Sequence, residues 1–130
     1  MWWLRTAVGD LQAAQVLLKN ESLPPRGSAQ FAQQAAEKAL KAAIASTGSE
    51  PARTHDLVYL ALRCRSELQR DLGPIDIAML SAVLAASRYP GRTDAPINHA
   101  DATTWVADAE RIVALVARHC DVDLASLSAA

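Results

Sequence analysis

The chain has 130 residues, a net charge of −1 and 51% hydrophobic residues, of which few are aromatic. This length makes about one domain, and the near-zero charge excludes a global basic field that would capture nucleic acid nonspecifically. Alternating runs of β-branched residues that would predict strands are missing, and the few glycines and prolines are clustered. The composition therefore predicts an all-α protein, in which any phosphate binding must be local.

The first helix is predicted from about Trp2 to Asn20, because apolar residues recur there at three- and four-residue steps. Its apolar stripe comprises Trp3, Leu4, Ala7, Val8, Leu11, Ala14, Leu17 and Leu18. Two prolines and a glycine within residues 23–27 end this helix. Ser28 is the expected N-cap of the next one, since its hydroxyl can accept from a free amide of the first turn.

The second helix is predicted to run from Ser28 to a stop at Gly48. Its expected inner face comprises Phe31, Ala35, Ala36, Ala39, Leu40, Ala43 and Ile44. The polar residues expected mostly off that face are Gln33, Gln34, Glu37, Lys38 and Lys41. Glu37 and Lys41 form an i,i+4 pair in the favourable order, so the glutamate could orient the lysine.

Thr54 is the expected N-cap of a third helix, with Asp56 in its first turn. The stripe of this helix comprises Leu57, Leu60, Ala61, Cys64 and Leu68. A glycine and a proline at positions 73–74 interrupt the pattern. A short helix is then predicted over about residues 75–87.

A loop over residues 88–98 leads to the last helix, for which Asn98 is the expected cap and His119 lies near the end. The inner residues of this helix are Trp105, Ala109, Ile112, Val113 and Val116. The elements together predict an up-and-down bundle of four to five helices over residues 1–120. Residues 121–130 are expected to form a short frayed tail.

Two cysteines, Cys64 and Cys120, are too few for a disulfide scaffold, and neither belongs to a CxxC or Cys/His zinc motif. We therefore expect a reduced, cytoplasmic compartment, with no metal and no cofactor. The apolar start of the chain is interrupted by Asp10, and no signal-cleavage pattern follows it. No run of about 18 apolar residues occurs, so we expect no membrane span.

Three short motifs occur in order: Phe31–Lys41, the Thr-His-Asp-Leu of residues 54–57, and the Arg-Tyr-Pro of residues 88–90. With them, the chain resembles the HEPN family of small helical domains over nearly its whole length. The resemblance implies a bundle that commonly dimerises and that, in many members, works with a minimal nucleotidyltransferase encoded beside it. It also implies RNA cleavage in toxin members with an Arg-x4–6-His motif, and nucleotide or RNA binding in members without it.

Arg92 and His99 satisfy Arg-x6-His at the place where the resemblance puts the toxin motif. Histidine can take the proton of an RNA 2′-hydroxyl while arginine stabilises the charge on the phosphate, and no metal is required. Toxin members typically continue His-x-Tyr, whereas Ala100 and Asp101 follow the histidine here. The alternative is a solvated arginine and a histidine that helps to cap its helix.

Four further residues are candidates for ligand binding: Arg88, Lys38, Lys41 and His55. Arg88 shares a loop with Arg92, and the two would make a local cationic spot. The two lysines could contact phosphate or belong to a solvated face. His55 precedes an aspartate, but adjacent helical residues do not face each other, so a structural or interface role is the alternative to an acid–base pair.

These patterns favour a cytoplasmic, homodimeric HEPN-fold module that binds a nucleotide or RNA, or that docks a nucleotidyltransferase partner. The first alternative is a metal-independent, toxin-like endoribonuclease with His99 as base and Arg92 on the phosphate. The second alternative is a purely structural interaction protein.

Overall fold

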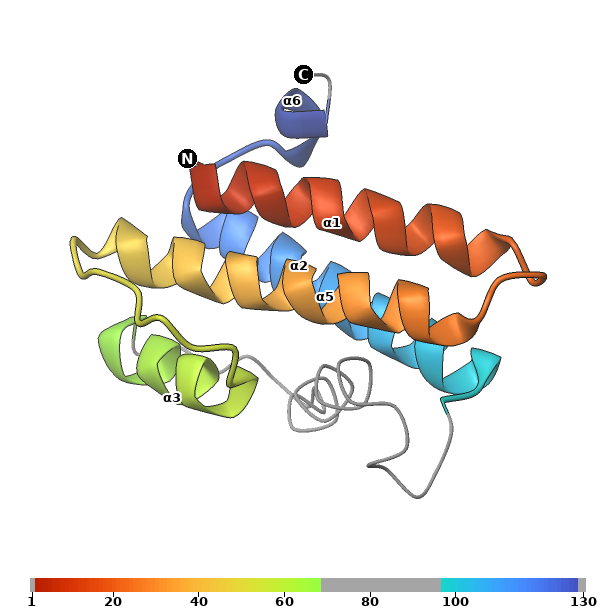
Figure 1. Ribbon diagram of the computed structural model, residues 1–130. Coiled ribbons are helices and arrows are strands. Elements are labelled where there is room, and N and C mark those ends of the chain that lie inside the picture. Colours follow the sequence, from red (N-terminus) through yellow and green to blue (C-terminus); the bar gives the residue numbers. More distant parts are fainter. Residues whose placement is uncertain (1, 69–96, 129–130) are drawn as a thin grey trace.

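The computed structural model describes residues 2–68 and 97–128 (Figure 1). All regular elements of these two ranges are helices, which confirms the predicted all-α bundle. They are α1 (Trp2–Lys19), α2 (Pro25–Ser46), α3 (Leu57–Leu68), α5 (His99–His119) and α6 (Leu124–Ser128). The helix predicted over residues 75–87, and most of the loop after it, lie outside the described residues.

The central helix of the bundle is α2. Helices α1, α3 and α5 all pack against it, and α1 also contacts α5 (Figure 1). Its alanines let these neighbours approach closely, and those almost fully buried are Ala29, Ala32, Ala35, Ala36, Ala39, Ala42 and Ala43. With three helices around it, α2 is buried over most of its circumference. The single inner face predicted from the sequence is therefore too narrow.

The start of α2 differs from the prediction, because the helix begins at Pro25 rather than after Ser28. Proline suits the first helical position, where its fixed φ angle is already helical and its missing N–H is not needed. Ser28 lies inside the first turn and donates from Oγ to the carbonyl of Pro25 at 2.9 Å. At the other end, Gly48 has a φ of +87°, which confirms the expected glycine stop.

The N-cap of α3 is Asp56, not Thr54 as predicted. The Oδ1 atom of Asp56 accepts from the backbone amides of Val58 at 3.0 Å and Tyr59 at 3.3 Å. Thr54 instead accepts the amide of Asp56 at 3.1 Å and forms a turn just before the helix. Both residues can cap a helix, and the one whose oxygen reaches two free amides does so.

Helix α5 begins as predicted, with Asn98 as its cap. The Asp101 amide donates to Asn98 Oδ1 at 2.7 Å, and the Asp101 carboxylate accepts from the Asn98 amide in return. Replacing Asn98 by alanine should lower the free energy of unfolding by about 1 kcal/mol, whereas Asn98→Asp keeps the acceptor and should change it little. Urea denaturation of the two variants measures the difference, and equal stabilities would argue that this cap contributes nothing.

The residues after α5 contain more structure than the expected frayed tail. They include the short helix α6, which contacts α1, and Leu127 is only 8% exposed. The segment after α5 therefore packs against the bundle at α1. The expected domain boundary after residue 120 stays a prediction.

The core lies where α1, α3 and α5 meet α2. Its fully buried large side chains include Leu4, Leu40, Ile44, Leu57, Leu60 and Ile112. Trp105 is 6% exposed and belongs to this core, as predicted. Cys64 is also buried, donates to the Leu40 carbonyl at 3.4 Å, and has its thiol pKa raised by burial to about 12. Among the described helices, none combines the length and apolarity needed to cross a bilayer.

Candidate functional site

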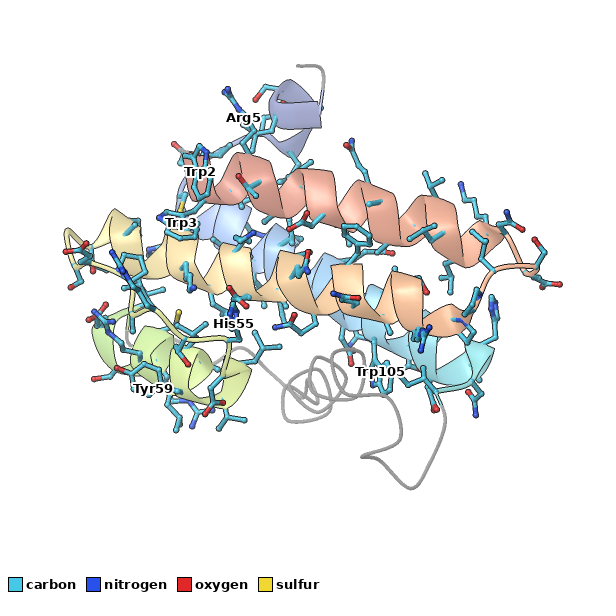
Figure 2. All side chains as sticks on the ribbon, in the orientation of Figure 1. Trp2, Trp3, Arg5, His55, Tyr59 and Trp105 are labelled. Carbon is cyan, nitrogen blue, oxygen red and sulfur yellow. The ribbon has the colours of Figure 1, made fainter. Side chains whose placement is uncertain are left out.

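A buried carboxylate organises the polar residues of α2. Gln33, Glu37 and Lys41 are spaced four residues apart, so they lie along one line of the helix. His55 approaches the same carboxylate from the segment that joins α2 to α3 (Figure 2). We call these four residues the Glu37 cluster.

Both oxygens of Glu37 are engaged. Lys41 Nζ donates to Oε2 at 3.1 Å, Gln33 Nε2 donates to Oε1 at 3.3 Å, and His55 Nδ1 lies 2.7 Å from Oε1. The side chains of Glu37 and Lys41 are only 4% and 8% exposed. The expectation that the polar residues of α2 lie mostly off the buried face is therefore wrong for these three, because α1, α3 and α5 surround the helix.

The environment of Glu37 favours its charged form. Burial by itself would raise the pKa of this carboxyl, but the hydrogen bonds from His55 and Lys41 and the charges of both outweigh burial and lower the pKa. Glu37 is therefore a carboxylate at neutral pH. Its charge is shared between a buried lysine and a histidine at the surface.

His55 is the exposed member of the cluster. Its side chain is 52% exposed, and its Nδ1 atom is held by the buried carboxylate. Within the described part of the chain, its Nε2 atom makes no hydrogen bond. A carboxylate that fixes one imidazole nitrogen sets the orientation of the ring and leaves the other nitrogen for a ligand or a proton. The pairing of His55 is with Glu37, not with its sequence neighbour Asp56.

Gln33 adds an unused acceptor to the cluster. Its side chain is fully buried, and its Oε1 atom finds no hydrogen-bond partner among the residues described. Nearly all buried polar atoms in proteins are hydrogen-bonded. The Oε1 atom of Gln33 is therefore a candidate to accept a hydrogen bond from a further donor. Both carboxylate oxygens of the cluster thus have partners, whereas Gln33 Oε1 and His55 Nε2 have none among the described residues.

The other candidate lysine of α2, Lys38, belongs to a different contact. Its Nζ atom lies 3.5 Å from Asp10 Oδ2 on α1. Burial raises the pKa of Asp10, although the nearby Lys38 opposes that shift. The structure therefore brings Lys41 and His55 together on one carboxylate, and it directs Lys38 to α1.

Trp3 of α1 borders the cluster, and Trp2 packs against Trp3. Lys41 Nζ lies 5.4 Å from the centroid of the Trp3 ring, which is a cation–π distance. The Trp2 and Trp3 rings meet edge to face, with centroids 4.8 Å apart and planes at 80° (Figure 2). They border a pocket of about 210 Å³, lined by Trp2, Trp3, Ala42, Ala45 and Ser46. Trp3 is partly buried against the core, as its place on the apolar stripe predicts.

The residues of the predicted ribonuclease motif are only partly described. His99 is the first residue of α5 and is exposed. Since Asn98 and Asp101 make the cap, the His99 side chain is not needed for it, and the capping alternative is not supported. Arg88 and Arg92 lie outside the described residues, so their relation to His99 stays a prediction.

The sequence reasoning missed Gln33 and Trp3 as parts of a site and treated Glu37 only as an orienting residue. The four-residue spacing of Gln33, Glu37 and Lys41 is the signal that could have joined them. No comparable signal links His55 or Trp3 to this line, because both come from other segments. In the described ranges, no group of three or more His, Cys, Asp or Glu residues is placed to hold a metal ion.

The fold and the cluster define a helical-bundle domain whose central helix carries a buried carboxylate between a lysine and a histidine. Residues 1–119 match the family model of the HEPN domain, so the chain belongs to the HEPN family. No curated protein and no solved structure gave a significant match. Membership supports a nucleotide- or RNA-related module in general and, since HEPN domains commonly dimerise, a homodimer in general.

Proposed function

We propose that this HEPN domain binds a nucleotide or RNA and that His55 contacts a phosphate group of the ligand. The observation that carries the proposal is the state of His55, half-exposed at the surface while a buried, ionised carboxylate holds its Nδ1 atom at 2.7 Å. Its ring is oriented before any ligand arrives. Preorganisation of this kind lowers the entropic cost of binding.

The charges of the cluster suit a phosphate. Glu37 and Lys41 neutralise each other, so a protonated His55 leaves one positive charge at the surface. Glu37 accepts from Nδ1, and Nε2–H is then free to donate a charge-assisted hydrogen bond to a phosphate oxygen. A protonated His55 would thus be a local cation on a chain of net charge −1, in line with the expectation from composition that any phosphate binding is local.

Calorimetric titration tests the proposal with AMP and with a ten-nucleotide single-stranded RNA of mixed sequence. His55→Gln should weaken binding of both probes by about tenfold or more, because one charge-assisted hydrogen bond is lost. The matched control is His119→Gln at the last residue of α5, outside the Glu37 cluster. This variant should bind both probes as the wild type does. Equal affinities of His55→Gln and wild type would overturn the role of His55.

A partner is part of the proposal. We propose that two copies of the chain associate and that the dimer acts with a nucleotidyltransferase-type protein. The family supports the first association in general. Exposed apolar side chains on α3, namely Val58, Tyr59 and Leu62, support protein–protein contact at this helix.

The second candidate function is metal-independent RNA cleavage by Arg92 and His99. The observation in its favour is that the His99 imidazole is exposed and is not used by the cap of α5. Incubation of a mixed RNA without metal, with wild type and His99→Ala in parallel, tests it. Cleavage by wild type alone would make the protein an endoribonuclease. No cleavage, together with no binding of AMP or RNA, would leave the structural interaction protein.

A further inference from the structure

We infer that the pocket bordered by Trp2 and Trp3 binds a nucleobase, beside the phosphate contact at His55. The inference rests on the proposed function and adds a second contact to it. It assigns the base and the phosphate of one ligand to the two sides of Lys41, the pocket toward α1 and His55 toward α3.

The walls of the pocket are suited to a flat aromatic ring. Trp2 is 64% exposed, which is unusual for a residue with so large an apolar surface. Its ring stands at 80° to that of Trp3, so the two indoles form a corner with one ring face and one ring edge. Bases stack on aromatic side chains with little dependence on their identity, because every base has a π face.

The floor of the pocket consists of small side chains. Ala42 and Ala45 come from α2 and leave room between it and the indoles. Ser46 lies at the same end, where its hydroxyl donates to the Ala43 carbonyl at 2.6 Å and also has a hydrogen bond with the Cys120 thiol, so it adds a polar edge to the floor. The volume of about 210 Å³ lies below the roughly 300–1,000 Å³ typical of pockets for drug-sized ligands. The pocket therefore holds one ring system rather than a whole nucleotide.

Lys41 connects this pocket to the Glu37 cluster. Its Nζ atom lies 3.1 Å from Glu37 Oε2 and 5.4 Å from the centroid of the Trp3 ring. The pocket therefore borders Lys41 through Trp3, and His55 contacts the carboxylate with which Lys41 pairs. Figure 2 shows Trp3 on the side of α1 and His55 on the side of α3. A ligand with both an aromatic ring and a phosphate uses both contacts. An apolar side chain from a partner protein would use only the pocket.

Quenching of tryptophan fluorescence tests the inference, with each of the four nucleosides, AMP and inorganic phosphate as probes. Trp105 is buried and should report little, so a nucleoside signal would come from Trp2 and Trp3. At least one nucleoside should quench wild type and Trp2→Phe, which keeps an aromatic ring. Trp2→Ala should weaken binding of that nucleoside and of AMP by about tenfold. The control Val16→Ala removes another exposed side chain of α1 and should leave binding unchanged.

The outcomes separate the base contact from the phosphate contact. His55→Gln should weaken AMP binding and leave nucleoside quenching unchanged. If AMP binds and depends on His55 but Trp2→Ala has no effect, the base site is overturned and the proposed function stands. If a nucleoside quenches through Trp2 while His55→Gln leaves AMP affinity unchanged, the base site stands without the phosphate contact. Quenching by none of the nucleosides overturns the inference and leaves a protein side chain as the occupant.

Discussion

Replacing Glu37 by alanine should lower the free energy of unfolding by about 3–5 kcal/mol. The reason is that Lys41 would then be a buried ammonium without a counter-charge, since Glu37 is its only ion-pair partner within the described structure and its side chain is 8% exposed. His55 adds less to this loss, because its half-exposed ring can be solvated when the carboxylate is removed.

Urea denaturation at neutral pH measures this effect, with two further variants as controls. Glu110→Ala removes an exposed glutamate of α5 and should change stability by less than about 0.5 kcal/mol. The double variant Glu37→Leu with Lys41→Met removes both charges together and should recover most of the lost stability. A loss below about 1 kcal/mol for Glu37→Ala would contradict the account, because the pair would then not be buried in solution.

Acidification should remove the contribution of the same carboxylate within a defined pH range. The pKa of Glu37 is lowered in the folded protein from its usual value of 4.5, so the folded state binds fewer protons there than the unfolded state does. The stabilisation is therefore complete above pH 4.5 and is lost as the pH falls through the lowered pKa. Asp10 acts in the opposite sense. Burial raises its pKa above 3.8, so its protonation adds stability as the pH falls.

Unfolding free energies measured from neutral pH to strongly acidic pH test these signs. Glu37→Gln should flatten the loss of stability on acidification, since the titrating group is gone. Asp10→Asn should steepen it, because the opposing contribution has been removed. The same acid profile for Glu37→Gln and the wild type would show that Glu37 has no lowered pKa.

Much of the fold follows from signals within single segments. The apolar periodicity of residues 2–20 and the cap at Asn98 predict α1 and α5 almost to the residue. Where two residues a few positions apart can both begin or cap a helix, the predicted helix start is shifted by those few positions. Asp56 rather than Thr54 caps α3, because the Asp56 oxygen reaches the free amides of the first turn. Helix α2 begins at Pro25 rather than after Ser28, because the φ angle of proline is already helical.

The sequence predicted several residues of the candidate site but not their arrangement in space. The pair of Glu37 and Lys41 follows from i,i+4 spacing, and both lysines and His55 were candidates for ligand binding on residue type alone. The contact between His55 and Glu37 could not be predicted, because the two residues are 18 positions apart along the chain and belong to different segments. Likewise, nothing local predicts that Lys41 lies beside Trp3 of α1.

The sequence by itself therefore determined the helical class, the helix ends marked by strong caps and the motifs that resemble the HEPN family. These properties depend on periodicity, capping and spacing, which act over a few residues. Only the tertiary structure decided that α2 is surrounded by three helices, so that Gln33, Glu37 and Lys41 are buried rather than solvated. Burial converts an ordinary i,i+4 ion pair into a carboxylate that must be satisfied. The packing of α1 and α3 on α2 then brings Trp3 to Lys41 and His55 to Glu37.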